Sequence, residues 1–239
     1  MRKRALIIVG WLLISPLFST VDAGKIPSSQ QSERVIKRVK PLLERRLSQK
    51  GLSYGLPIFI RIFKHSGELE LWMEYQHRYK LFKTYPICTY GWGGLGPKLR
   101  RNDSQAPEGF YFVTPRQLNP YSSYHLSFNL GYPNRYDREH GRTGGALMIH
   151  GNCVSLGCFA MTDRLIEEIY ALADGAFRGG QPFFRVHIFP FRMTPANMEK
   201  RKNSRWIEFW RNLKEGYDFF QRENRPPNVT VKTNRYVFE

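Results

Sequence analysis

Acidic side chains are scarce in this chain. Of its 239 residues, 20 are Asp or Glu and 37 are Lys or Arg, which gives a formal net charge of +17. Such a surplus favours an anionic partner, and nucleic acid, an anionic polymer and a membrane face are the candidates. No nucleic-acid motif is present, and the basic residues are spread along the chain rather than clustered. We therefore predict no nucleic-acid partner, which leaves an anionic polymer or a membrane face.

Cysteine is scarcer still, with three residues, Cys88, Cys153 and Cys158. Zinc ligands usually come as pairs two to four residues apart, with a second pair farther along the chain. Four residues separate Cys153 from Cys158, but no second pair follows, which argues against a zinc site. Because the count is odd, at least one thiol stays unpaired within the monomer.

Internal repeats and an apolar run long enough to span a membrane are also absent. Residues 1–23 have the pattern of a secretory signal peptide, with a basic start, an apolar core over 5–18 and a cleavage site before Gly24. The core is short for a membrane span, so an uncleaved anchor is the less favoured alternative. Export would place a mature chain without a transmembrane span in an oxidising compartment.

The remaining chain, with 41% hydrophobic residues overall, suits one packed domain with extensions. Helical spacing of apolar residues predicts an N-terminal helical extension over 24–54, and Pro41 within it predicts two short helices or a kink. Alternation then predicts an antiparallel meander of three strands, over residues 58–63, 69–73 and 79–85.

Further along, the pattern predicts a strand over 124–130, a helix after Asp163 and a closing strand over 183–189. A C-terminal helical extension over 191–239 would start at Thr194-Pro195, carry an aromatic stripe and end at Pro226-Pro227 before a polar tail.

The stretch from Ile149 to Asp163 concentrates reactive side chains. An apolar run reads as a short strand that ends on His150, and Gly157 directly precedes Cys158. A thiol nucleophile needs a base, usually His, and a preceding glycine lets the backbone bend so that N–H groups converge on an oxyanion. A core histidine, a buried cysteine and a Cys153–Cys158 disulfide are the alternatives from these residues alone.

This stretch resembles the active-site motif of the YkuD-type L,D-transpeptidases, cysteine enzymes of bacterial peptidoglycan. Leu156 stands where that family usually has His, and Ala160 where it often has Arg. With the short spacing between its two halves, the stretch is similar in particular to the YafK-like murein transpeptidase subfamily. The matching positions are His150, Gly151, Ser155, Gly157, Cys158 and Met161.

The resemblance implies a mainly β fold, an L,D-transpeptidase-like β-sandwich over residues 55–190 with flanking helices. It implies that Cys158 attacks a tetrapeptide stem, that His150 is the base, that backbone N–H groups near Gly157 and Cys158 hold the oxyanion, and that Ser155 orients His150 or the loop. No metal or organic cofactor is implied. The expected location is the bacterial periplasm, in association with the cell wall.

Two other functions stay open at this point. A hydrolytic variant would act as an L,D-carboxypeptidase, or as an amidase that frees a lipoprotein attached to peptidoglycan. A non-catalytic peptidoglycan-binding protein would carry the same motif in degenerate form, against which the intact His150 and Cys158 argue.

Substrate-binding candidates come from two long loops and one strand. Trp92 lies in the Gly-rich loop 91–109 and is a candidate sugar platform. Arg135 and Arg142, in loop 132–145, are candidates for holding a stem-peptide carboxylate in place of the missing Arg, and His125 is the second histidine considered for the site. If Cys158 must stay free for catalysis, the pairing compatible with activity is Cys88–Cys153, with three free thiols as the alternative.

Overall fold

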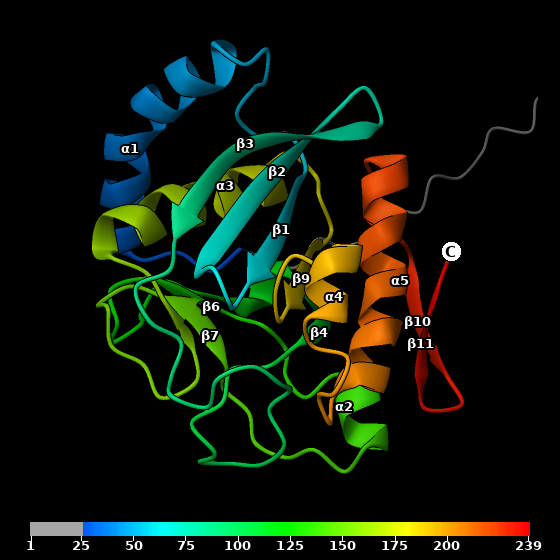
Figure 1. Ribbon diagram of the computed structural model, residues 1–239. Coiled ribbons are helices and arrows are strands. Elements are labelled where there is room, and N and C mark those ends of the chain that lie inside the picture. Colours follow the sequence, from blue (N-terminus) through cyan, green and yellow to red (C-terminus); the bar gives the residue numbers. More distant parts are fainter. Residues whose placement is uncertain (1–25) are drawn as a thin grey trace, which may run out of the picture.

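A computed structural model describes residues 26–239 (Figure 1), so the predicted signal peptide lies outside the described residues. The larger of its sheets has the strand order β3-β2-β1-β9-β4. Strands β1 and β9 run parallel, and the other neighbours run antiparallel. The strands are β1 (Ile58–Phe63), β2 (Glu68–Tyr75), β3 (Arg78–Pro86), β4 (Gly109–Val113) and β9 (Phe184–Phe189).

The predicted meander is confirmed as β1 to β3. The strand predicted over 183–189 is also present, but it lies inside the sheet between β1 and β4 rather than closing it. All residues of β1 are buried, on both faces of the strand. A central strand of this kind needs a layer on each side of the sheet.

A smaller sheet, of order β5-β6-β7-β8, carries the motif of His150 and Cys158. Its last two strands run parallel, which brings chain segments on either side of the 151–158 loop together. The strand predicted over 124–130 is shorter, because only its second half pairs. The strands are β5 (Leu118–Asn119), β6 (Ser127–Asn129), β7 (Met148–His150) and β8 (Phe159–Ala160).

Helices α1 (Gln30–Ser48) and α3 (Asp163–Arg178) pack against each other behind the larger sheet (Figure 1). The sequence predicted either two short helices or a kink at Pro41. The first alternative is wrong, since α1 is one helix with Pro41 inside it. Ion pairs of Arg38 with Glu167 (2.6 Å) and of Arg46 with Glu168 (3.0 Å) tie α1 to α3 on both sides of the proline. This tertiary support offsets the hydrogen bond that Pro41 cannot donate.

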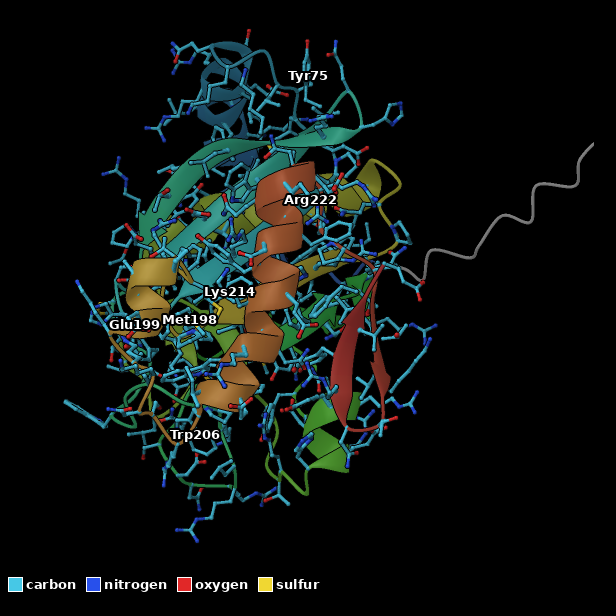
Figure 2. The ribbon with its side chains drawn as sticks, turned by 45° about the vertical axis from the view of Figure 1, so that its right-hand side comes forward. Tyr75, Met198, Glu199, Trp206, Lys214 and Arg222 are labelled. Carbon is cyan, nitrogen blue, oxygen red and sulfur yellow. A yellow bond between two sulfur atoms is a disulfide. The ribbon has the colours of Figure 1, made fainter. Side chains whose placement is uncertain are left out.

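The C-terminal segment covers the opposite face of the larger sheet (Figure 2), where the aromatic stripe of α5 packs. The single helix predicted from Thr194 is divided into two, because residues 200–206 form turns, and Trp206 then precedes the second helix. The expected polar tail is a hairpin held by the burial of Val231 and Tyr236. These elements are α4 (Pro195–Glu199), α5 (Ile207–Glu223), β10 (Val229–Lys232) and β11 (Arg235–Phe238).

The predicted fold class is confirmed in part: sheets with flanking helices are present, but helix (30%) and strand (25%) contribute comparable shares, so a mainly β class is not confirmed. Helices cover both faces of the larger sheet, which gives a layered arrangement of helices and sheets. Two short helical elements, η1 (Pro115–Gln117) and α2 (Arg135–Glu139), lie in the loops. Over residues 26–239, no helix combines the length and apolar character that a membrane crossing requires.

A buried ion pair joins the larger sheet to the long loop before β4 and to α5. Lys64 directly follows β1 and donates to Glu108 (3.0 Å) and to the carbonyl oxygens of Gly96 (2.8 Å) and Ala106 (3.1 Å). Glu108 also accepts from the Gly96 N–H (2.6 Å) and from the Trp210 indole (2.8 Å). Both charged side chains are fully buried. The pair therefore fixes loop 91–108 to the sheet and to α5.

Replacing Glu108 by Gln should lower the free energy of unfolding by about 3–5 kcal/mol, because the substitution leaves the Lys64 ammonium buried without its counter-charge. Denaturant unfolding measures this change. The control is a substitution of Glu199 (labelled in Figure 2) by Gln, which breaks the exposed Glu199–Lys202 pair and should cost less than about 1 kcal/mol. Equal losses in the two variants would contradict the anchoring role of the buried pair.

Candidate active site

Parallel pairing of β7 with β8 brings His150, the last residue of β7, and Cys158, which directly precedes β8, to the same region of the smaller sheet. Ile149 pairs with Phe159 and His150 with Ala160, so Cys158 lies level with the start of β7. The Met148 N–H donates to the Cys158 sulfur (3.4 Å), which fixes the side chain there. Both residues line one cavity of about 1270 Å³.

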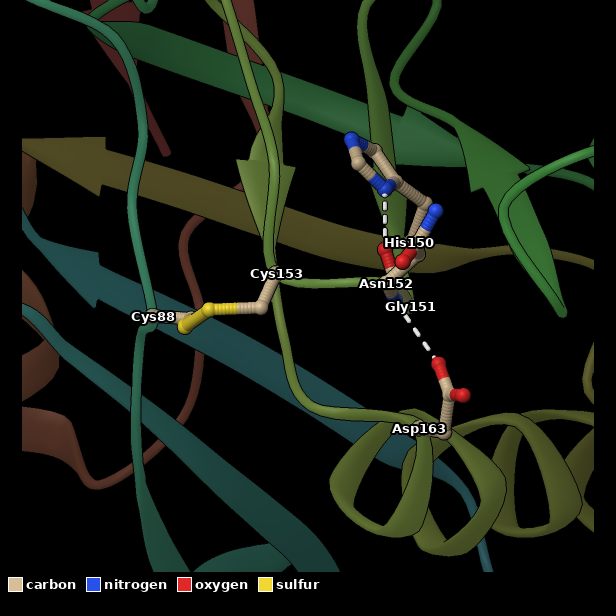
Figure 3. The surroundings of a disulfide bond; sticks show 6 residues. All are labelled: Cys88, His150, Gly151, Asn152, Cys153 and Asp163. Atoms are coloured by element: carbon tan, nitrogen blue, oxygen red, sulfur yellow. Dashed lines mark hydrogen bonds between the residues drawn. A yellow bond between two sulfur atoms is a disulfide. The ribbon is translucent and has the colours of Figure 1, made fainter.

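The His150 imidazole is arranged as a base. Its Nδ1 lies 2.6 Å from the carbonyl oxygen of Gly151 (Figure 3), and since a carbonyl only accepts, Nδ1 carries the proton. Nε2 therefore keeps its lone pair. Burial lowers the pKa of His150 below 6.5, and the Gly151 carbonyl opposes this in part. The Tyr124 ring packs against the imidazole, with centroids 4.8 Å apart.

The Cys158 thiol is the one free thiol among the described cysteines. It donates weakly to the Ala146 carbonyl oxygen (3.7 Å). Burial raises the pKa of Cys158 above 9.0, and the Met148 N–H and the Lys98 ammonium oppose this in part. The directions of the two pKa shifts together describe a resting pair of neutral thiol and neutral imidazole rather than a thiolate–imidazolium pair.

Ser155 and Gly157 shape the loop that carries the thiol. The Ser155 hydroxyl donates to the Cys158 carbonyl oxygen (2.7 Å) and accepts from the Gly157 N–H (3.0 Å), so both bonds go to the loop and none to His150. Gly157 has φ +142°, and an added Cβ would lie 3.2 Å from the Gln105 carbonyl oxygen. Its N–H is engaged, which removes it from the expected set of oxyanion donors. The Cys158 N–H has no acceptor in the described part of the chain.

A disulfide joins Cys88, just beyond β3, to Cys153 in the same loop (Figure 3). Their Cα atoms are 5.4 Å apart, within the range that a disulfide spans. The hypothesis of a Cys88–Cys153 bridge is therefore confirmed, and the Cys153–Cys158 alternative is wrong. The neighbouring Asn152 N–H donates to Asp163 at the start of α3 (2.7 Å). Two consecutive residues thus tie the beginning of the Cys158 loop to β3 and to α3.

Of the predicted substrate-binding residues, only Trp92 lines this cavity, and its side chain is 84% exposed. Arg142 is buried in an ion pair with Asp137 (2.8 Å), so its prediction as a carboxylate ligand is wrong. Arg135 lies outside the cavity and pairs with Glu139. His125 is also outside it, because its ring nitrogens contact Gln31 (3.0 Å) and Glu167 (2.9 Å) and join α1 to α3.

Sequence reasoning missed several cavity residues. Lys98 and Arg101 supply positive charge, and Lys98 is buried beside Asp103 (2.5 Å). Arg101 has no ion pair within residues 26–239 and its side chain is exposed. Both residues lie in loop 91–109, and the unusual length of this loop was the feature of the sequence that could have pointed to them. Other lining residues that were missed are Asn102, Ser104 and Tyr124.

The cavity has no acidic side chain among its described lining residues. In residues 26–239, no group of three or more His, Cys, Asp or Glu side chains is placed to hold a metal ion. The groups present can supply a thiol, a base and cationic contacts. They therefore suit attack on the carbonyl carbon of an anionic peptide.

The family model and the curated relatives that match this chain point to the same family. The L,D-transpeptidase catalytic domain (YkuD) matches residues 68–188. The chain is 46% identical over 237 residues to the Escherichia coli K12 protein named "Putative L,D-transpeptidase YafK", covering 99% of this chain and 90% of that protein. The protein of the same name in Escherichia coli O157:H7 matches with the same identity and coverage.

Among solved structures, the helical cell shape determining protein Pgp2 (K307A mutant) of Campylobacter jejuni matches at 17% identity and a TM-score of 0.48, over 81% of this chain and 65% of that one. Bdellovibrio bacteriovorus Bd1075 matches at 24% identity and a TM-score of 0.41, over 68% and 60%. The family match and the full-length relative carry the assignment: the chain belongs to the L,D-transpeptidase family with a YkuD-type catalytic domain.

Proposed function

We propose that this protein modifies peptidoglycan as a cysteine L,D-transpeptidase that forms a thioester with a tetrapeptide stem on Cys158. One observation carries the proposal: a free thiol and an imidazole with an unprotonated Nε2 line the same cavity. Family membership supplies the substrate class. The cavity volume is ample for a peptide, and its cationic lining suits the carboxylates of one.

The acylation step begins with proton transfer. On substrate binding, the thiol turns from the Ala146 carbonyl oxygen toward His150 and gives its proton to Nε2. The sulfur then attacks the carbonyl carbon of the third stem residue, and the N–H of Cys158 donates to the oxygen as it gains negative charge. The C–N bond to the terminal D-residue breaks, His150 returns the proton to the leaving amine, and a thioester remains.

The second step releases the acyl group. An acceptor amine gives a proton to His150 Nε2, attacks the thioester carbon and forms a new amide bond. The sulfur leaves and recovers the proton from His150, so enzyme and protons balance over the cycle. If water takes the place of the amine, the product is a free acid and the same residues act as a hydrolase. The masses of the products separate the two reactions.

Ser155 contributes to this chemistry through the loop. Its bonds to the Gly157 N–H and the Cys158 carbonyl oxygen keep the peptide plane between those residues turned so that the Cys158 N–H stays free. The disulfide and the Asn152–Asp163 bond hold the beginning of the loop, at residues 152 and 153. These contacts support Ser155 as a positioning residue for the nucleophile.

Incubating the pure protein with a defined disaccharide tetrapeptide tests the proposal. Intact-protein mass spectrometry should detect a covalent adduct on Cys158, and the product masses should show loss of the terminal D-residue. Cys158→Ala should abolish both, because no other thiol replaces the nucleophile. The matched control is the double variant Cys88→Ala/Cys153→Ala, which removes the other two cysteines and should still form the adduct. An adduct on any other residue would contradict the assignment.

The acid limb of kcat/KM should lie below pH 6.5. A lowered pKa keeps His150 unprotonated, and therefore active as a base, to a lower pH than an ordinary histidine. His150→Ala should lose about 10²–10⁴-fold in kcat/KM and the acid limb with it. His65→Ala, at an exposed position, is the control. If His125→Ala instead removed the acid limb, the wrong histidine would have been chosen.

Arg101→Ala should raise KM about tenfold for a stem peptide with free carboxylates, because a charge-assisted contact to a carboxylate is lost, and should leave kcat nearly unchanged. With the same peptide amidated at its carboxylates, the variant and the wild type should differ little. Arg100→Ala is the matched control, since Arg100 is the exposed neighbour that does not line the cavity. Equal effects of the two substitutions would exclude a role for Arg101 in recognition.

A further inference from the structure

Lys98 is a buried charge in the catalytic cavity to which the proposed reaction steps give no role. Its side chain is 5% exposed, although it belongs to the long loop 91–109 rather than to a strand or a helix. A buried ammonium needs a counter-charge, and Asp103 supplies one at 2.5 Å. Lys98 lines the cavity and Asp103 does not, so the positive member of the pair is the one that faces the nucleophile.

Asp103 holds the Lys98 ammonium in a fixed place. Its carboxylate oxygens also accept from the backbone N–H groups of Leu99 (2.8 Å), Arg100 (3.0 Å) and Gln105 (3.2 Å). Burial by itself would raise the pKa of Asp103, but the hydrogen bonds that the carboxylate accepts together lower it. The carboxylate therefore stays charged, and the turn that it closes keeps the ammonium beside it.

The chain segment that leads into β7 contacts both Lys98 and the nucleophile. At its start, the Lys98 Cε lies 3.1 Å from the place that a Cβ on Gly144 would occupy. Farther along, the Ala146 carbonyl oxygen accepts from the Cys158 thiol (3.7 Å), and the Met148 N–H donates to the Cys158 sulfur (3.4 Å). One short segment thus places the buried ammonium near the thiol.

The other charges in the cavity leave Lys98 as the main electrostatic neighbour of the thiol. The described titratable side chains that line the cavity with Cys158 are Lys98, Arg101, Tyr124 and His150. Lys98 and Arg101 are the cations among them, and Arg101 is exposed to solvent, which screens its charge. Burial raises the pKa of Cys158, and the Lys98 ammonium is the charged group that opposes this effect.

We infer that Lys98, held by Asp103, stabilises the negative charge that the Cys158 sulfur gains when it loses its proton. The ammonium has three N–H donors, and Asp103 is its one hydrogen-bond acceptor among residues 26–239. Its other donors are therefore available to the sulfur or to an oxygen of a bound ligand. The thiol proton still passes to His150, and no bond forms or breaks at Lys98. That the resulting thiolate attacks a peptide carbonyl rests on the proposed function.

Alkylation of the full chain by iodoacetamide tests this inference without any peptide substrate. Without reductant it reports on Cys158 alone, because the other two cysteines are joined, and intact-protein mass spectrometry follows it. The thiolate is the form that reacts, so the midpoint of the rate against pH measures the ionisation of the thiol. In Lys98→Met the midpoint should rise by about one pH unit, which makes alkylation below the midpoint about tenfold slower.

Two further readings separate charge from packing. The limiting rate at high pH, where the thiol is fully ionised, should change little in Lys98→Met, and Lys98→Arg should restore most of the wild-type midpoint. Asp103→Asn keeps the ammonium and removes its counter-charge, so its midpoint should fall below that of wild type. This variant also tests the inference if Lys98→Met does not fold. Arg100→Met is the matched control, since Arg100 is an exposed neighbour outside the cavity, and it should keep the wild-type midpoint.

Several outcomes would overturn the inference: an unchanged midpoint in Lys98→Met, equal shifts in Lys98→Met and Arg100→Met, or a midpoint in Asp103→Asn that does not fall. A change in the limiting rate alone would show that Lys98 only controls access to the thiol, and would overturn it too. The proposed function fails separately. If wild type forms no adduct with the stem peptide, a shifted midpoint in Lys98→Met still stands, and if the adduct forms while the midpoint stays unchanged, only the inference is lost.

Discussion

The buried Lys64–Glu108 ion pair is the contact on which the rest of the structure depends. Its members come from the end of β1 and from the end of the long loop that precedes β4, and Trp210 of α5 completes the set. One charge pair therefore fixes the central sheet, the C-terminal segment and the loop that supplies Lys98 and Arg101 to the catalytic cavity. A buried charge tolerates only a well-satisfied geometry, so this pair leaves the loop little freedom to move.

The loop that carries Cys158 is also held in place, by a disulfide and by hydrogen bonds. The disulfide holds Cys153 to the end of β3, Asp163 holds Asn152 to α3, and Ser155 holds the backbone around Gly157. Only Cys158 keeps a free thiol, and its raised pKa keeps that thiol protonated at rest. Because the thiolate is the reactive form of cysteine, a raised pKa makes the Cys158 thiol less reactive on its own and leaves a role for a base in the proposed mechanism.

The surplus of basic residues has a local counterpart in the cavity that Cys158 and His150 line. No acidic side chain is among its described lining residues, and Lys98 and Arg101 contribute to its lining. Such a lining favours ligands that carry carboxylates or carbonyl oxygens.

Local sequence was enough to predict the β1–β3 meander, β9, α3 and the strand that ends on His150, because alternation and helical spacing depend on near neighbours. It also marked Cys158 and His150 as a candidate pair. The structure alone decided what lies far apart in sequence: the continuity of α1 through Pro41, the burial of Arg142 against Asp137, and the tethering of His125 by Gln31 and Glu167. Placing Lys98 beside Cys158, and pairing Cys88 with Cys153, likewise depended on strand order, since no local pattern encodes the distance between segments that only the fold brings together.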